Sequence, residues 1–292
     1  MTTAILDIVL AGIVIGGIYS LVAIGLNLQW GVTRVLNVSH GEFIMFGAFG
    51  AYFLYTLFGI SPLISLVIVG PIMFGLAVVY HRVLFLHLLK SAQTMAAYEV
   101  NSLLVAYGLM FIMQNGASLA WGGTLKGYTY LANSIEIAGS LLAVNRLIVF
   151  IFAICFCIGI YFFLNRTRMG KAIRATSLDI DTAQLMGVNV YALLAVAFGL
   201  GAMLAALAGA LISMLFPTTP FMGTPYLVIT FIVVILGGMG NMLGSLIGGF
   251  ILGFIGSIVT YIEPGFSMVA FYIIFLIIIL AKPTGILGKQ AA

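Results

Sequence analysis

Two ionisable side chains stand between long apolar runs in the segment Asn37-Val38-Ser39-His40-Gly41-Glu42-Phe43. Ionisable residues inside a membrane are rare and often mark the route of a solute or ion. Ser39 and Glu42 also have the spacing of a capping box, in which Glu42 bonds back to the backbone of the N-cap Ser39. Both readings can hold together, because a helix N-terminus at membrane depth can line a pathway. We therefore take Asn37, Ser39, His40 and Glu42 as pathway candidates, without a constellation for catalysis.

A glycine-rich run that begins at Gly237 is the second candidate. It lacks the Gly-Lys-Ser/Thr ending of a phosphate loop, and that motif occurs nowhere in the chain, so no ATP site is expected here. Gly240, Gly244 and Gly248 share one helical face, which favours close helix packing. Alternatively, the pair Gly237-Gly238 breaks the helix, and unwound backbone there and at Gly240 faces a pathway.

Other polar residues lie near the ends of apolar runs. They are Asn27, Gln29, Glu99, Gln114 and Asn115. Most such residues are interfacial, whereas those that face the interior of a bundle bond between helices or line a pathway. Gln114 and Asn115 are carried forward as pathway candidates.

The one long polar segment covers residues 165–190 and holds Arg174, Asp179 and Asp181. Its residues Ala183, Leu185, Met186 and Val188 give it an apolar side. By pattern alone this could be an amphipathic helix that lies on the membrane surface. Its mixture of acidic and basic residues instead favours docking into a groove of a soluble partner protein.

Composition sets the environment of these segments. The chain has 292 residues, of which 63% are hydrophobic and 6% charged, whereas soluble domains carry about 25% charged residues. Its surroundings are therefore mostly lipid, and the net charge of +4 is not a nucleic-acid signal because the basic residues lie in short loops. Cys155 and Cys157 fit buried thiols, and no metal site is expected. The basic region of a cleaved signal peptide is missing from residues 1–7.

The apolar runs predict an all-α integral membrane protein with eight or nine spans, two of them short or broken. The runs are 5–29, 40–58, 62–80, 99–120, 146–164, 191–213, 226–238, 243–261 and 267–281. Basic residues in the loops near 81–90, 165–174 and 282–289 place those loops in the cytoplasm. The N-terminus and the irregular loops 121–145 and 214–225 then lie outside.

The two ends of the chain have related patterns within a single transmembrane domain, residues 1–292. A span rich in small residues followed by a glycine-interrupted segment occurs first at 12–51 and again at 197–253. The second of these first spans is the fifth run after the first, so the two point in opposite directions. We expect an inverted repeat with halves 5–120 and 191–281, an architecture common among transporters.

These pieces together resemble the permease family of branched-chain amino acid ABC importers, over nearly the whole chain. The most specific parts are residues 37–45, Met113-Gln114-Asn115, the segment 170–189 and Leu236-Gly237-Gly238-Met239-Gly240. The segment is similar to the coupling motif through which such permeases contact their ATPases. The resemblance puts Ala183 in the coupling helix and Gly187 in the turn after it, with Arg174, Asp179, Asp181 and Met186 beside them.

The resemblance implies a subunit of the inner membrane of a bacterium or archaeon. Its partners would be a second permease chain, two cytoplasmic ATPases that hold the ATP and magnesium, and an extracytoplasmic substrate-binding protein. Family members often carry Glu near the position of Gly256, and similar permeases import urea, amides or other small solutes. The competing class is a stand-alone transporter coupled to an ion through Glu42, Glu99 or His40, and a membrane enzyme lacks a catalytic set.

Overall fold

The computed structural model describes residues 2–137, 139–282 and 284–288. The chain forms, in order, α1 (Thr2–Thr33), α2 (His40–Phe58), α3 (Pro62–Tyr80), the π-helical turn η1 (His81–Phe85), α4 (Leu86–Ser91) and α5 (Met95–Trp121). A hairpin of β1 (Ser134–Ile137) and β2 (Ser140–Ala143) leads into α6 (Val144–Arg166), α7 (Arg168–Leu178) and α8 (Ile180–Leu185). The rest is α9 (Val190–Ile212), α10 (Gly223–Gly237), α11 (Met242–Ile262), the 3₁₀ turn η2 (Pro264–Phe266) and α12 (Ser267–Ala281).

Eight helices in the described part of the chain are long and apolar enough to cross a membrane. A ninth apolar helix, α10, has 15 residues, which is shorter than the roughly 20 that a bilayer requires. The all-α membrane fold predicted from the sequence is therefore confirmed. The loop 121–145 differs from the expectation, because it contains the antiparallel β1–β2 hairpin, in which Ser134 pairs with Ala143.

Side-chain caps explain where several helices begin. Ser61 precedes Pro62 at the start of α3 and accepts a bond from the Leu63 backbone N–H, and a proline at the first helical position loses no helix bond. Asn189 and Asn241 cap α9 and α11 by accepting backbone N–H bonds. These three polar residues thus mark helix starts.

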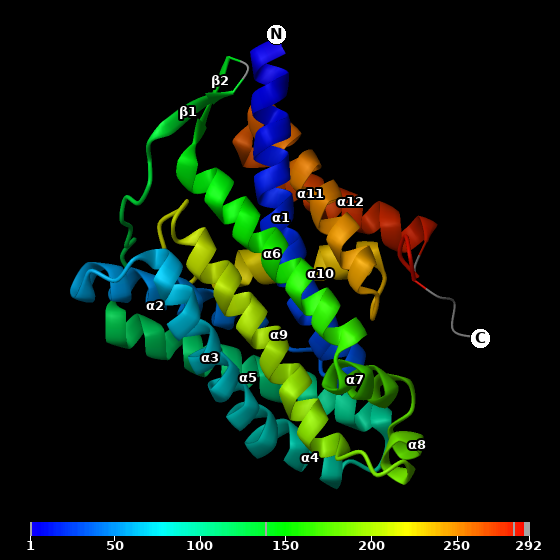
Figure 1. Ribbon diagram of the computed structural model, residues 1–292. Coiled ribbons are helices and arrows are strands. Elements are labelled where there is room, and N and C mark those ends of the chain that lie inside the picture. Colours follow the sequence, from blue (N-terminus) through cyan, green and yellow to red (C-terminus); the bar gives the residue numbers. More distant parts are fainter. Residues whose placement is uncertain (1, 138, 283, 289–292) are drawn as a thin grey trace.

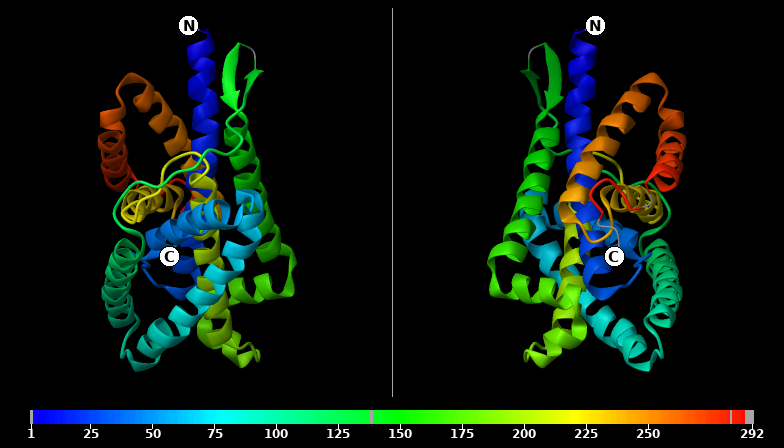
Figure 2. Two further views of the ribbon diagram at one scale, coloured as in Figure 1. Left: turned by 90° about the vertical axis from the view of Figure 1, so that its left-hand side faces the viewer. Right: turned by 90° about the vertical axis from the view of Figure 1, so that its right-hand side faces the viewer.

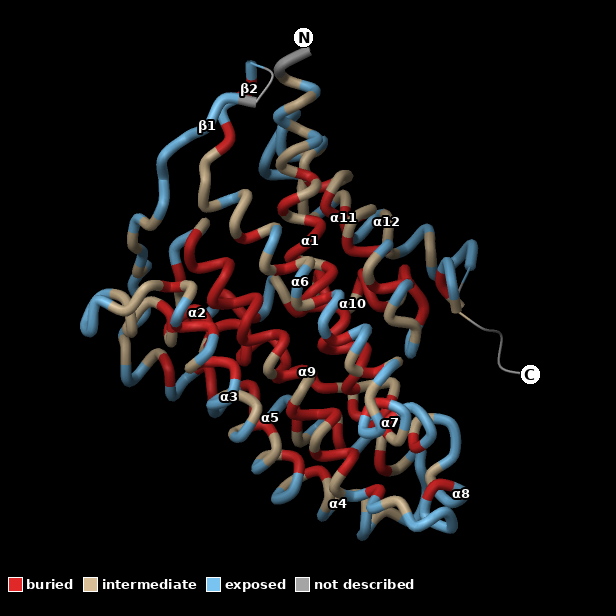
Figure 3. Tube along the Cα trace, viewed as in Figure 1, coloured by how far each residue is buried: buried red, intermediate tan, exposed pale blue. Residues whose placement is uncertain are grey.

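The helices α1 and α9 form the centre of the bundle, and buried residues are concentrated along them (Figures 1 and 3). Their backbones come close where Gly25 and Gly201 meet, since a side chain on either would collide with the carbonyl oxygen of the other. Gly209 of α9 packs in the same way on the Ile44 backbone of α2, and Gly253 of α11 on Gly16 of α1. Small residues therefore let the central backbones approach, as expected in lipid.

The packing is reciprocal between the two ends of the chain. Helix α1 packs against α10 and α11, while α9 packs against α2 and α3. In both Figure 1 and Figure 2, α2 and α10 lie crosswise to α1, and their N-termini meet where Gly41 contacts Gly223. Each central helix thus packs on the second and third helices of the other half. The inverted repeat is not tested by these contacts and stays a prediction.

The two ends of the bundle carry different structures. The N-terminus and the β1–β2 hairpin lie at one end, and α4 and α8 lie at the other (Figure 1). Lys126 forms an isolated bridge with Thr218, and the Tyr128 hydroxyl lies 2.9 Å from the Ser213 hydroxyl, so the loops 121–145 and 214–225 lie together. Burial raises the pKa of Tyr128 to about 12, so its phenol stays protonated there.

Candidate functional site: a buried polar centre, an exposed coupling segment and an outer cavity

The fully buried His40 ring is held between α1 and the start of α2. Its Nδ1 lies 3.0 Å from the Gln29 side-chain oxygen, and its Nε2 lies 3.2 Å from the Val22 carbonyl oxygen. The Gln29 amide nitrogen donates to the Phe198 carbonyl of α9 at 2.9 Å. One glutamine therefore joins α1, α2 and α9. Both neighbours of the His40 ring are acceptor oxygens, so a neutral ring, with a single N–H, donates to only one of them.

Asn37 and Ser39 belong to this same network. The Asn37 amide donates to the Gln29 oxygen at 3.1 Å, and the Ser39 hydroxyl donates to the Asn37 side-chain oxygen at 2.6 Å. The predicted capping box is wrong, because the Ser39 side chain makes no cap bond to the helix. Its hydroxyl is engaged by Asn37, so the Ser39 carbonyl alone receives the Glu42 backbone N–H, at 3.0 Å.

Glu42 lies buried where the N-termini of α2 and α10 meet. Its Oε2 has no hydrogen-bond partner among the described residues, and a side chain at Gly223 would come within 2.9 Å of its Oε1. The Gln114 amide donates to the Thr224 hydroxyl at 3.4 Å, one residue further along α10. The amide end of Asn115 instead bonds to Phe111 of its own helix and is exposed. Glu42 and Gln114 thus approach the same helix start, which Asn115 does not.

The glycine turn between α10 and α11 is held from two sides. The Asn27 amide of α1 donates to the Asn241 carbonyl at 2.8 Å and to the Ser245 hydroxyl at 2.7 Å, and its oxygen accepts from the Gly240 N–H. From the other side, the Ile286 N–H donates to the Leu236 carbonyl at 2.7 Å. Gly238 has φ +98°, which favours glycine.

Two of the three glycines of the turn are packed. Gly237 packs directly on the Gly244 backbone, and Gly238 on Gly288, whereas Gly240 is exposed with open space beside it. Gly237 and Gly238 therefore lie in a packed junction of α1, α10, α11 and the C-terminal segment, and a pathway role of the turn stays a prediction. Asn27 of α1 holds this junction. The sequence alone left open whether its side chain lies at the membrane interface or faces the interior of the bundle.

The polar segment 165–190 forms two short helices at the end of the bundle that carries α4 (Figure 1). Thr167 caps α7, and Gly170 packs so tightly on the Leu164 backbone that a side chain there would collide with it. Asp179 caps α8 by accepting from the backbone N–H groups of Asp181 and Thr182. The hydrogen bond from the Thr182 hydroxyl, together with these backbone bonds, lowers the pKa of Asp179.

Helix α8 and the residues just before and after it include one buried and several exposed apolar side chains. Ala183 is buried, whereas Leu178 is 88% exposed, Leu185 87% and Met186 79%. Gly187 then takes φ +79° in open space and turns the chain into α9. Arg174 lies on α7, where it donates to the Asn165 side chain at 2.8 Å. The structure therefore places Ala183 in a helix and Gly187 in the following turn, as predicted.

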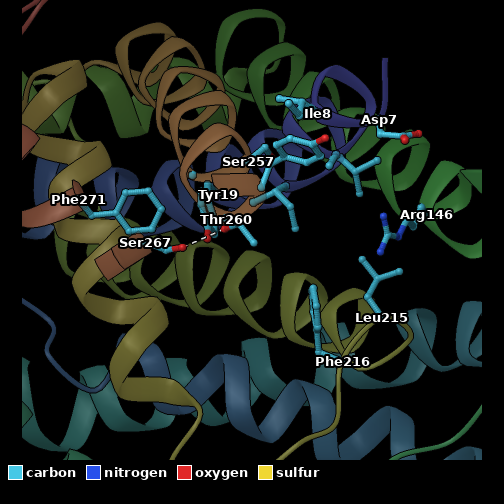
Figure 4. A pocket seen from close by; sticks show the side chains of 15 residues that line it. Asp7, Ile8, Tyr19, Arg146, Leu215, Phe216, Ser257, Thr260, Ser267 and Phe271 are labelled. Carbon is cyan, nitrogen blue, oxygen red and sulfur yellow. Dashed lines mark hydrogen bonds between the residues drawn. The ribbon is translucent and has the colours of Figure 1, made fainter. Parts of the chain in front are cut away.

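Sequence reasoning missed a cavity at the opposite end of the bundle, beside the N-terminus of α1. It has a volume of about 490 Å³ and lies between α1, α11 and α12 (Figure 4). Asp7 and Arg146 line it, together with mostly apolar side chains. The sequence did not indicate this cavity, because Asp7 and Arg146 are isolated charges near span ends. Only the packing of α1 against α6 brings them together. No group of three or more metal-ligating side chains occurs within the residues that the structure describes.

These features define a multi-pass membrane protein with a buried polar centre and an exposed segment of short helices. The family described as the branched-chain amino acid transport system permease component matches residues 8–281. Because that match spans nearly the whole chain, the protein belongs to this family of membrane permeases.

Named relatives agree with this family. The permease protein LivH of a high-affinity branched-chain amino acid transport system from Salmonella typhimurium is 28% identical, over 95% of this chain and 94% of the relative. BraD, from the corresponding system of Pseudomonas aeruginosa, is 25% identical over the same shares. A probable LivH of Methanocaldococcus jannaschii is 28% identical over 85% of this chain and 79% of the relative.

One solved structure shares the fold. It is PsaBC from Streptococcus pneumoniae in complex with Fab, with a TM-score of 0.51, 13% sequence identity, and coverage of 96% of this chain and 92% of that chain. At this identity the likeness concerns the arrangement of helices alone.

Proposed function

We propose that this permease carries branched-chain amino acids into the cytoplasm as one subunit of an ATP-driven importer of the inner membrane. The family match over residues 8–281 carries the proposal, and the names of the relatives support the substrate class. A second, related permease chain, two cytoplasmic ATPases and an extracytoplasmic binding protein complete the importer. ATP and magnesium are bound by the ATPases.

The exposed side of α8 supports docking of an ATPase. Leu178, Leu185 and Met186 present apolar side chains at a polar end of the molecule, where they need a partner to leave water. In the proposed complex they enter a groove of the ATPase, with Arg174, Asp179 and Asp181 at its polar rim. This explains apolar residues within the most charged segment of the chain.

Contacts between helices provide a route from α8 to the centre of the bundle. Ala183 anchors α8 in the protein, and its carbonyl accepts the Val188 N–H at 3.2 Å just before α9. The Lys90 ammonium lies 5.1 Å from the centre of the Tyr191 ring, which links α4 to the start of α9. A movement of α8 therefore acts on α9, which packs on α1, α2 and α3. In our proposal ATP-driven approach of the two ATPases shifts these helices between two arrangements that open to opposite sides.

Glu42 favours the alternative of an ion-coupled transporter, since its Oε2 is buried with no hydrogen-bond partner among the described residues. His40 does not argue against this alternative, because its ring faces two acceptor oxygens and only a protonated ring donates to both. A permease of the same family for urea or amides differs only in substrate. Uptake measurements distinguish the ATP-driven amino acid importer from the ion-coupled transporter and from the urea or amide permease.

The test is leucine uptake into proteoliposomes that contain this chain with the permease, ATPases and binding protein encoded beside it. Gly187→Arg should abolish uptake that requires ATP. Gly59→Arg is the matched control, because Gly59 also follows a helix, has φ +67° and faces open space, but lies away from α8. Uptake driven by a proton or sodium gradient without ATP would overturn the proposal, and ATP-driven uptake of urea but not leucine would correct the substrate.

A further inference from the structure

The outer cavity combines two unlike surfaces. Its deeper part lies around Tyr19 and Phe271, whose rings pack edge to face with centres 6.2 Å apart. Leu215 and Phe216 form another part of its wall, and Asp7 and Arg146 lie together on one side of it (Figure 4). Sites for small molecules are commonly apolar cavities of this size with a few converging polar groups.

The two charged residues lie at a junction between cavities. A second cavity of about 450 Å³, beneath the β1–β2 hairpin, is lined by Leu10, Gly139 and Leu142 and shares Asp7 and Arg146 with the first. The Asp7 carboxylate accepts a hydrogen bond from the Ser140 hydroxyl. No hydrogen bond from Arg146 is found within the described residues, and Asp7 makes no ion pair with it there. A cation and an anion thus flank one space without neutralising each other.

This junction lies at an exposed end of the bundle. The apolar helix from Ala4 to Thr33 has 30 residues, which is about 45 Å at 1.5 Å per residue, against a hydrocarbon core of about 30 Å. Its first turns, with Asp7, lie beside the β1–β2 hairpin at that end (Figure 1). Asp7 and Arg146, which lies in the first turn of α6, are both exposed, so a solute can reach them.

We propose that this cavity is a binding site for an α-amino acid zwitterion with an aliphatic side chain. The guanidinium of Arg146 binds the α-carboxylate, the carboxylate of Asp7 binds the α-ammonium, and the side chain of the solute enters the apolar part near Tyr19. The proposal rests on the proposed function and adds to it a place where this chain itself selects its substrate.

The two charged residues of the proposed site would distinguish an amino acid from solutes that lack one or both of its charged groups. A fatty acid of the same shape would leave Asp7 without a cation, and an alkyl amine would leave Arg146 without an anion. Arginine matches a carboxylate with two parallel bonds, which a lysine cannot reproduce. The hydroxyls of Thr260 and Ser267 are hydrogen-bonded to each other at 2.9 Å. Neither therefore requires a polar group on the side chain of the solute. Urea is uncharged, so it forms no ion pair with Asp7 or Arg146.

The experiment measures direct binding by saturation-transfer difference NMR. The sample is the complex of both permease chains with their two ATPases in nanodiscs, without the binding protein or ATP. The probes are leucine, 4-methylpentanoate, which lacks the ammonium group, and 3-methylbutylamine, which lacks the carboxylate. We expect a leucine signal, with at least about tenfold weaker binding of the other two, because each loses a charge-assisted bond.

Variants then locate the site. Asp7→Asn and Arg146→Met should each weaken leucine binding at least about tenfold, and Arg146→Lys should keep part of it. Glu136→Gln and Lys126→Met are the controls, because these residues lie at the same end of the molecule but outside the linings of the two cavities. Asn at position 7 keeps the acceptor for Ser140, so the fold is preserved.

Several results would overturn the proposal. They are no leucine signal from the wild-type importer, equal binding of all three probes, or binding that both cavity variants leave unchanged. Leucine uptake driven by ATP is measured in parallel on the same purified complex, reconstituted into proteoliposomes and supplied with the binding protein and ATP. Normal uptake without cavity binding refutes this site and leaves the proposed function intact, whereas absent uptake refutes the proposed function itself.

Discussion

The buried centre around Gln29 and the exposed helix α8 differ in which residues stand in an unfavourable environment. In the centre, the side chains of Gln29, Asn37 and His40 are polar, fully buried and bonded to one another. At α8, Leu185 and Met186 are apolar and largely exposed. Polar residues thus join helices inside the bundle, whereas apolar residues at α8 form an exposed surface, on which we propose that a partner docks.

The largest expected effect comes from removing the polar centre. Gln29→Leu removes the acceptor for the Asn37 amide and beside His40 Nδ1, and the side-chain donor to the Phe198 carbonyl, and we expect a loss of roughly 3 kcal/mol in unfolding free energy. Urea unfolding in mixed micelles measures it. Asn115→Leu is the control, because its amide bonds only within its own helix. Equal losses from the two variants would refute the distinction between the centre and the surface.

The double variant Leu185→Glu, Met186→Glu tests the other side of the comparison. We expect ATPase association to weaken at least about tenfold, since the docking surface becomes acidic, while unfolding free energy changes by less than about 0.5 kcal/mol. Pull-down with the purified ATPase and the same unfolding assay give both values. Leu125→Glu, also exposed but in the outer loop, should change neither. A loss of stability without a loss of association would show that α8 is structural.

Removing the bonds from Asn27 to the glycine turn should lower the unfolding free energy less than Gln29→Leu does. Asn27→Leu removes the bonds to Asn241, Ser245 and Gly240 but leaves the contacts of the C-terminal segment, so we expect a loss of about 2 kcal/mol. Hydrogen exchange should increase at Gly240 and Gly244. Faster exchange at His40 instead would mean that Asn27 and Gln29 act as one network.

The smallest effect concerns pH at the start of α8. The pKa of Asp179 is lowered in the folded protein, so its capping bonds stabilise α8 above the ordinary aspartate pKa of about 3.9 and are lost as pH falls through the lowered folded pKa. Hydrogen exchange at Asp181 and Thr182, referenced to intrinsic rates, should rise over that acidic range. In Asp179→Asn the cap no longer titrates, so a rise of equal size there would contradict this assignment.

The sequence predicted most of the fold because span length and apolarity are local properties. All nine apolar runs contain helix, and segment 165–190 forms the polar helices that its pattern indicated. The capping box failed because its Ser39–Glu42 spacing cannot reveal that Asn37 engages the Ser39 hydroxyl. Asp7 and Arg146 are 139 positions apart in the printed sequence, so only the packing of α1 beside α6 brings them to one cavity. Long-range convergence of isolated charges leaves no periodic signal in a single sequence.

The most direct test of the account is photo-crosslinking from α8 in the assembled importer. A photoreactive amino acid at Leu185, which is exposed, should crosslink to the ATPase, and the yield should change when ATP is added. The same probe at Ala183, two residues away but buried, should give little product. Equal yields at both positions, or no ATPase adduct from Leu185 in a complex that transports leucine, would contradict the claim that α8 is the docking surface.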